Sequence, residues 1–133
     1  MRGVIDTNVF IYDTFEDSEF HKEAEKILES LDVWYVPSIV LQEFVWFFKG
    51  TEFSVTETWE VLNGYIRDPR FRGLNDTPKV VENALRILIE ENLSLSRFND
   101  AIILVHAIEK GALVTFDSKF RKLAKRRGVK VLP

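Results

Sequence analysis

The chain has 133 residues but no cysteine and only two histidines. Without cysteine it cannot form disulfides, thiolate metal sites or a cysteine nucleophile. No apolar run approaches the ~18 residues that a membrane-spanning helix needs. Near the N-terminus Asp6 interrupts the apolar run at once, so a signal peptide is not expected. We therefore expect a soluble, cytoplasmic protein that does not associate with membranes.

The chain also lacks an excess of positive charge. Its formal net charge is −3, which argues mildly against generic binding of nucleic acid. However, residues 13–32 carry eight acidic side chains against two lysines, whereas residues 119–130 carry seven basic side chains and no acidic one. A polyanion could therefore meet only the C-terminal part of the surface, and the net charge does not exclude one.

Length and hydrophobic content predict one folded domain spanning residues 1–133. Domains most often have ~100–150 residues. Hydrophobic residues make up 46% of the chain, which is ordinary for a globular protein. No repeat, low-complexity tract or long linker suggests a second domain.

Short apolar runs alternate with segments of helical periodicity along the chain. Strands are expected at residues 4–5, 33–36, 71–74, 112–116 and 129–132. Helices with their capping or terminating residues are expected at 18–31, 38–50, 54–68, 77–89, 96–111 and 118–127, and a polar loop between Asp6 and residue 18. The expected N-terminal caps are Ser38, Ser54, Thr77 and Ser96. This alternation predicts an α/β protein with a mainly parallel sheet covered on both faces.

Ligands of such sheets bind beyond the carboxyl ends of the strands. Asp6 follows the first expected strand, and Asp117 follows the strand near residue 114. Either aspartate alone is explained at least as well by a turn or a helix cap, because aspartate favours both positions.

Two further carboxylates lie on helices that are apolar on nearly all faces. Glu43 has bulky apolar residues on both sides, and a buried carboxylate without a partner protonates or finds a cation. Alternatively, Gln42, Glu43 and Lys49 mark a narrow solvated stripe. Asp100 lies near the start of its helix, where the dipole favours an anion by ~0.3–1 kcal/mol, although Ser96 already satisfies the expected cap.

Together, the four carboxylates could converge at one end of the sheet. At ~5 Å and an effective dielectric constant of ~20, each pair repels by roughly 3 kcal/mol, so such a cluster stays ionised only if cations neutralise it. Four negative charges match two divalent ions. Oxygen ligands favour hard cations such as Mg²⁺ or Mn²⁺, and the chain has no cysteine and histidine set for zinc.

Four segments carry a resemblance to a known family. They are Val-Ile-Asp-Thr-Asn at 4–8, Pro-Ser-Ile-Val-Leu-Gln-Glu at 37–43, Phe-Asn-Asp-Ala at 98–101 and Leu-Val-Thr-Phe-Asp-Ser-Lys-Phe at 113–120. In this order and spacing, the sequence resembles PIN-domain nucleases, and among them the small VapC-type toxins of toxin–antitoxin pairs. Residues 51–75 match little beyond helix length.

The resemblance implies a three-layer α/β/α fold with a central five-stranded sheet. It also implies a Mg²⁺- or Mn²⁺-dependent endoribonuclease that uses one or two ions and hydrolyses phosphodiesters by metal-activated water. The catalytic and metal-binding residues would be Asp6, Glu43, Asp100 and Asp117. The supporting polar residues would be Thr7, Asn8, Thr115 and Ser118. A toxin of this type implies RNA as substrate, a cognate antitoxin and a homodimer as partners.

Further candidate residues lie outside the acidic set. The basic residues Lys119, Arg121 and Lys122 contact RNA only if their helix borders the acidic pocket; otherwise they form a solvated face. The two histidines, His21 and His106, are interpreted as structural because neither is paired with a nucleophile. The aromatic residues of 44–48 are first of all core, and their excess suggests a dimer or antitoxin contact.

Three alternatives remain. An aspartyl-phosphate phosphatase normally has a second aspartate two residues after its nucleophile, where this chain has Asn8. A receiver domain needs an acceptor aspartate at the end of the third strand, where only Asp76 is near. A catalytically inactive PIN-like module that binds RNA or a protein is separated from the nuclease only by an assay.

Overall fold

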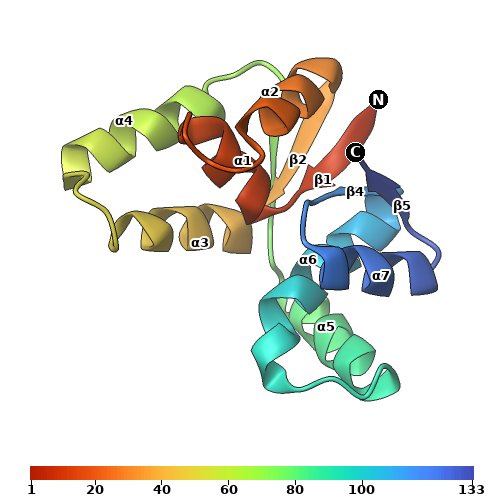
Figure 1. Ribbon diagram of the computed structural model, residues 1–133. Helices are drawn as coiled ribbons and strands as arrows, with labels where there is room; N and C mark the ends of the chain where they lie inside the picture. The colour runs from red at the N-terminus through yellow and green to blue at the C-terminus, as the bar shows by residue number, and fades with distance from the viewer.

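The computed structural model describes all of residues 1–133 and contains a five-stranded sheet with helices on both faces (Figure 1). The strands are β1 (Arg2–Ile5), β2 (Val33–Pro37), β3 (Phe71–Leu74), β4 (Ala112–Val114) and β5 (Lys130–Leu132). The helices are α1 (Thr7–Thr14), α2 (His21–Ser30), α3 (Ser38–Phe48), α4 (Val55–Ile66), α5 (Pro78–Glu90), α6 (Phe98–Lys110) and α7 (Ser118–Arg126), with a 3-10 turn, η1 (Leu95–Arg97).

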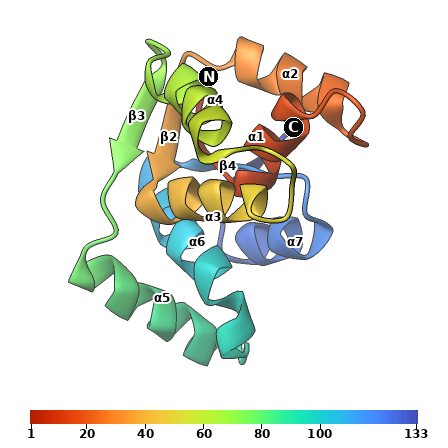
Figure 2. The same cartoon turned by 90° about the vertical axis from the view of Figure 1, so that its left-hand side faces the viewer.

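All neighbouring strands are parallel, in the order β3-β2-β1-β4-β5, which confirms the expected three-layer α/β/α fold. The helices α1 and α2 lie on one side of the sheet, and α6 and α7 on the other (Figure 1). Figure 2 shows β3 at the sheet edge beside β2, with α3 next to α6. The chain leaves β1 toward β2 and later returns to β1's other side with β4, so the strand order reverses between β1 and β4.

The segment after β1 was expected to be a loop, and that prediction was wrong. Residues 7–14 form α1, which packs Val9 and Phe10 into the core. The ring of Phe10 contacts Trp34 at 6.0 Å and Tyr65 at 4.6 Å between centroids. The helix has only eight residues, and its apolar positions form one short run, which is too little to display a helical period.

Two predicted helix caps were also wrong. The cap position of α3 is Pro37, while the Ser38 hydroxyl donates to the Leu74 carbonyl at 3.0 Å. The backbone N–H of Ile39 donates instead to Asp76, which lies beyond β3, at 2.7 Å. Ser96 lies inside η1, and α6 begins after Arg97 without a side-chain cap.

Elsewhere, local sequence signals predicted the helix ends correctly. The capping box of Ser54 and Glu57 forms both of its hydrogen bonds, and Thr77 caps α5. Gly111 ends α6 at a φ of 96°, a conformation that favours glycine. None of the helices combines the length and hydrophobicity that crossing a bilayer requires.

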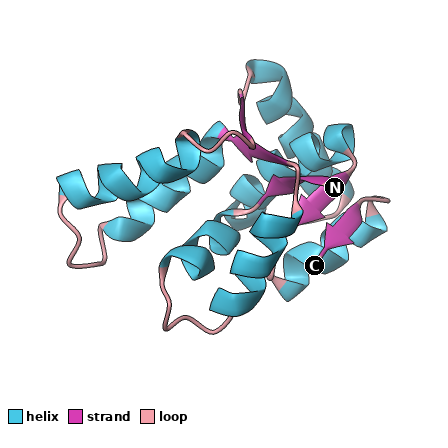
Figure 3. Ribbon diagram, turned by 90° about the horizontal axis from the view of Figure 1, so that it is seen from above, coloured by secondary structure: helices cyan, strands magenta, loops and turns pink.

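The α3–α4 hairpin projects from the sheet (Figures 1 and 3). Its side chains form an apolar groove. We use the name α3–α4 surface for the exposed groove residues Val45, Trp46, Phe53, Val55 and Trp59. Trp46 and Trp59 are 70% and 60% exposed, respectively. Of the aromatic residues of 44–48 that were expected to be core, Phe44 and Phe48 are buried, whereas Trp46 and Phe47 are exposed.

Candidate active site

Asp6 lies immediately after β1 and caps α1. It is only 7% exposed, and three neutral donors surround its carboxylate. The Thr7 backbone N–H donates to Oδ1 at 2.8 Å, while the Thr115 hydroxyl and the Asn8 amide donate to Oδ2 at 2.7 and 3.2 Å. No cationic side chain contacts it.

Burial raises the pKa of Asp6 from 3.8 to about 7. The hydrogen bonds from Thr115 and Thr7 lower this pKa, but the negative charges of Asp100 and Glu43 raise it further. The carboxylates of α3 and α6 are therefore close enough to act on Asp6, and a cation placed among them would favour the ionised form.

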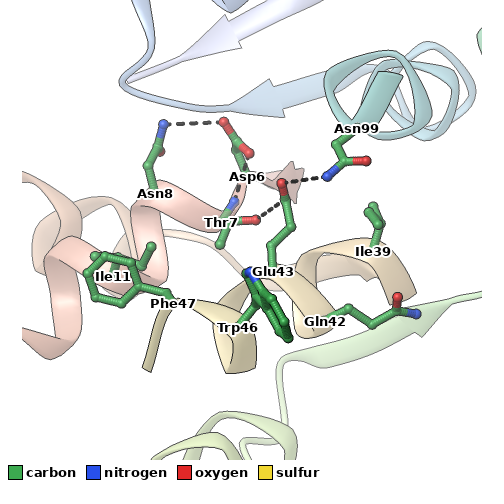
Figure 4. A pocket seen from close by; sticks show the side chains of 10 residues that line it. All are labelled: Asp6, Thr7, Asn8, Ile11, Ile39, Gln42, Glu43, Trp46, Phe47 and Asn99. Atoms are coloured by element: carbon green, nitrogen blue, oxygen red, sulfur yellow. Dashed lines mark hydrogen bonds between the residues drawn. The ribbon is translucent and has the colours of Figure 1, made fainter. Parts of the chain in front are cut away.

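Glu43 projects from α3 toward Asp6 (Figure 4). Its Oε1 accepts from the Thr7 hydroxyl at 2.6 Å, and its Oε2 accepts from the Asn99 amide at 3.0 Å. Thr7 therefore joins two of the predicted acids, because its backbone binds Asp6 and its side chain binds Glu43. This arrangement favours the convergent site over the solvated stripe considered from the sequence.

Asp100 lies in the first turn of α6 with a cationic partner. Arg97 donates from Nε to Asp100 Oδ2 at 2.9 Å. Burial raises the pKa of Asp100, the contact with Arg97 lowers it, and the charges of Asp117 and Glu43 raise it. Asp100 thus belongs to the same electrostatic group as the other acids.

Asp117 is the cap of α7 and is the most exposed of the four acids. Its Oδ1 accepts from the Phe120 backbone N–H at 2.9 Å, and its own N–H donates to the Thr115 hydroxyl at 3.1 Å. That hydroxyl also donates to Asp6, so buried Thr115 joins the Asp6 carboxylate to the backbone of Asp117.

The remaining predicted residues divide into two groups. Ser118 is exposed and makes no side-chain hydrogen bond, unlike Thr7, Asn8 and Thr115. Arg121 donates to the backbone carbonyls of Thr115 and Pro133, both at 2.9 Å, so its guanidinium holds the C-terminal end of the sheet. In contrast, Lys119 and Lys122 are exposed and form no ion pair.

Both histidines have structural partners. His106 hydrogen bonds to Asp76 at 2.6 Å, and His21 to the Tyr12 carbonyl at 2.9 Å. Because Asp76 also binds Ile39, it links α3 to α6, the two helices that carry Glu43 and Asp100.

A pocket of about 610 Å³ opens over Asp6 and Glu43 (Figure 4). Asn99 and Gln42 line its polar part, whereas Trp46 and Phe47 form an apolar wall. Neither Asn99 nor Arg97 was assigned a role from the sequence. A polar side chain within one helical turn of a predicted helical acid is the signal that would have identified both.

The chemistry of the donor set fits a hard divalent ion, since the side chains offered are carboxylates with neutral oxygen and nitrogen neighbours. Yet no group of three or more acidic or histidine side chains is arranged to hold one ion. Arg97 draws Asp100 toward itself, and the pocket wall includes Asp6 and Glu43 but neither Asp100 nor Asp117. A divalent ion would require these side chains to reorient.

These observations define a small, doubly wound α/β protein with an acidic site where the strand order reverses, the position at which such folds bind ligands. The family model described as PIN domain matches residues 3–126. The chain therefore belongs to the PIN domain family, which confirms the resemblance. No curated protein sequence matches it.

Several solved structures share the fold. VapC20 from Mycobacterium tuberculosis, described as a sarcin–ricin loop cleaving toxin, aligns with a TM-score of 0.76 and 18% identity over 92% of this chain and 94% of that one. VapBC2 from Rickettsia felis, bound to a promoter DNA fragment, aligns with a TM-score of 0.71 and 20% identity over 99% of this chain and 98% of that one. FitAcB from Neisseria gonorrhoeae aligns with a TM-score of 0.71 and 19% identity over 100% of this chain and 97% of that one. At these identities the likeness establishes the fold alone.

Proposed function

We propose that this chain is a Mg²⁺- or Mn²⁺-dependent endoribonuclease whose catalytic and metal-binding residues are Asp6, Glu43, Asp100 and Asp117. The observation that carries the proposal is the pair of bridging threonines. Thr7 donates to the carboxylates of both Asp6 and Glu43, while the Thr115 hydroxyl donates to Asp6 and accepts from the backbone N–H of Asp117. The Asp6 and Glu43 carboxylates are thus held together by neutral donors, which leaves their negative charge for a cation, and Asp117 is anchored beside them through its backbone.

The chain's own residues would orient the reacting groups. Thr115 and Asn8 fix Asp6 from one side, while Asn99 fixes the far oxygen of Glu43. Fixed donors of this kind orient carboxylate ligands before an ion arrives. When bound, the ion supplies polarisation of the scissile phosphate and of the attacking water. The apolar wall of Trp46 and Phe47 limits the access of bulk water on one side.

The test is RNA cleavage with purified protein, in Mg²⁺ or Mn²⁺ and in excess chelator. Because the M. tuberculosis relative is described as cleaving the sarcin–ricin loop, an RNA of that loop is the first substrate to try. We expect Asp100→Ala to abolish cleavage and the matched change Glu109→Ala, at an exposed acid of the same helix, to preserve it. Cleavage that survives in Asp100→Ala and in chelator would refute the proposal, whereas RNA binding without cleavage would support the inactive module instead.

The strand order argues against a receiver domain. Receiver domains of the CheY type have the order 2-1-3-4-5, whereas this sheet has β3-β2-β1-β4-β5. Asp76, the acid nearest the end of β3, accepts hydrogen bonds from Ile39 and His106 and is not free to act as an acceptor of phosphate.

We further propose that the α3–α4 surface binds a protein partner, the antitoxin of a toxin–antitoxin pair. Trp46 lines both this groove and the acidic pocket, so a protein seated there would also cover the pocket. Covering would inhibit cleavage, as expected of an antitoxin. Trp59→Lys should abolish complex formation with the antitoxin in size-exclusion chromatography and leave RNA cleavage intact. Complex formation unchanged by Trp59→Lys would argue against this surface.

We also propose that the protein acts as one cytoplasmic domain and forms a homodimer. A second apolar surface supports the dimer, because Leu85, Ile89 and Leu95 are 40%, 78% and 75% exposed beside one another in a groove at the end of α5. Light scattering of Ile89→Lys measures the expected dissociation. An unchanged mass would assign the dimer, if one forms, to another surface.

A further inference from the structure

Arg97 is the only cationic side chain that contacts any of the four acids. Asp6, Glu43 and Asp117 accept hydrogen bonds from hydroxyl, amide and backbone donors alone. Arg97 and Asp100 are 23% and 28% exposed, so their contact is largely removed from water. One of the four negative charges is therefore already balanced by the chain itself.

The guanidinium of Arg97 is incompletely satisfied. Its Nε donates to Asp100, but its Nη2 is buried and has no hydrogen-bond partner. It is the only buried side-chain nitrogen or oxygen atom in the protein that lacks one. An unpaired buried donor costs ~1–3 kcal/mol, and more on a charged group. Arg97 does not line the pocket over Asp6 and Glu43, but its partner Asp100 belongs to the same electrostatic group of acids. An acceptor that arrives with the substrate could therefore pair with this atom once the guanidinium leaves Asp100.

The chemistry of that acceptor follows from the donor. A guanidinium presents N–H groups in a rigid plane and binds carboxylate or phosphate oxygens. A carboxylate ligand would be repelled by the surrounding acids. A phosphodiester is also an anion, but divalent ions at the acids would attract it and Arg97 could bind its oxygen directly.

Resting on the proposed nuclease function, we propose that Arg97 is a built-in cation of the acidic site, which competes with divalent ions for Asp100 and binds a phosphate oxygen of the RNA through Nη2. Before an ion binds, the Arg97–Asp100 contact holds the helix-borne acid in place. Once an ion binds Asp100, the guanidinium is released to bind the substrate.

The test compares two dissociation constants, for Mn²⁺ and for RNA, which Arg97→Gln should change in opposite directions. The dissociation constant for Mn²⁺ is measured by isothermal titration calorimetry and electron paramagnetic resonance on wild type, Arg97→Gln and Arg97→Lys. Loss of one nearby positive charge should lower it by about tenfold in Arg97→Gln, while Arg97→Lys stays within about threefold of wild type. The matched control is Arg86→Gln, a change at an exposed arginine of α5.

The second readout is affinity for a fluorescein-labelled RNA hairpin, measured by anisotropy with the Asp6 carboxylate intact and with Ca²⁺, another ion that binds oxygen ligands, in place of Mn²⁺. A gel of the same samples confirms that the RNA stays intact. Here Arg97→Gln should weaken binding by about tenfold or more, because it removes a charge-assisted hydrogen bond. A loss of folding cannot strengthen binding of Mn²⁺ while it weakens binding of RNA, so the paired result separates the proposal from a general defect.

The contrary outcomes are distinct. If Arg97→Gln binds Mn²⁺ as weakly as wild type or more weakly, Arg97 only positions Asp100, and this inference is overturned while the nuclease proposal stands. Unchanged RNA affinity would overturn the phosphate contact. If neither wild type nor Arg97→Gln binds Mn²⁺, metal dependence itself is wrong, and the inference fails with it.

Discussion

Asp6 should lower the stability of the metal-free protein at neutral and alkaline pH. Its carboxylate is 7% exposed and has no cationic partner, and its pKa is raised from 3.8 to about 7. The unfolded chain therefore releases this proton near pH 4, whereas the folded chain keeps it until about pH 7. Between these values the folded state binds more protons than the unfolded state, so the free energy of unfolding falls as the pH rises.

The size of this effect follows from the shift. Each pKa unit corresponds to ~1.36 kcal/mol, so a shift of about three units gives an upper limit of ~4 kcal/mol between about pH 4 and about pH 8. Asp6→Asn removes the charge at nearly constant shape. Relative to wild type, the variant should gain stability across that interval, by ~2–4 kcal/mol in total. A pH-independent cost of ~1 kcal/mol is expected because an amide cannot accept from all three donors.

The assay is urea denaturation in chelator at several pH values for wild type, Asp6→Asn and Asp17→Asn. The last variant makes the same chemical change at an exposed aspartate in the loop after α1 and should run parallel to wild type. Carbon-13 NMR of the Asp6 carboxyl measures the titration directly, with an expected midpoint of about 7. Mn²⁺ at ~100 times its dissociation constant should restore ~2.7 kcal/mol to wild type and much less to Asp6→Asn.

Parallel pH profiles for wild type and Asp6→Asn would refute this reasoning. So would a carboxyl titration near pH 4, because it would mean that the donors from Thr7 and Thr115 outweigh burial. Loss of the Mn²⁺ effect in Asp6→Asn together with a flat pH difference would separate the two claims: Asp6 would bind the ion without being destabilising in its absence.

Three further changes test the scaffold. Gly3→Ala should destabilise the fold by ~1–3 kcal/mol in thermal unfolding, because the added Cβ would lie 2.7 Å from a side-chain carbon of β4. The control Gly64→Ala adds a Cβ that meets no such neighbour, so it should be neutral or stabilising. His106→Leu leaves Asp76 without one of its partners and should cost ~1–3 kcal/mol in urea denaturation; an unchanged midpoint would mean that this contact does not hold α3 and α6 together. Thr7→Val removes the hydroxyl that donates to Glu43 and should lower kcat by ~10–100-fold with little change in KM. If the hydroxyl served only folding, the variant would lose stability and keep its kcat.

The features that sequence reasoning predicted correctly are those encoded locally. The strands β1 and β4 are short apolar runs that end in polar residues, and parallel pairing then places their ends together. The capping box at Ser54 needs only Glu57, three residues away, and both bonds form. The same logic selected the four acids as candidates, because strand ends and apolar helices can be read from neighbouring residues, and their catalytic role stays a prediction.

The features that it missed have two different causes. Ser38 is a suitable local cap, yet Asp76 reaches the start of α3 because β3 brings it there. Arg97 precedes Asp100 by three residues, but its contact requires the 3-10 turn that replaces the helix start expected at Ser96. At α3 a tertiary partner overrides a local preference, and single-residue preferences carry no information about that partner. At α6 the partner is local, and the missed feature is the 3-10 turn before the helix.

The sequence posed capping and chemistry as alternatives for Asp6 and Asp117, whereas the geometry makes them compatible. The Oδ1 of Asp117 accepts from the N–H of Phe120, and no hydrogen bond within the chain occupies its Oδ2. The Oδ1 of Asp6 accepts from the N–H of Thr7, and its Oδ2 accepts from the side chains of Thr115 and Asn8. In each case the helix cap uses one carboxylate oxygen and thereby fixes the direction of the other. A helix cap at the end of a parallel strand consequently orients a carboxylate, so the capping role of these residues is compatible with the proposed catalytic role.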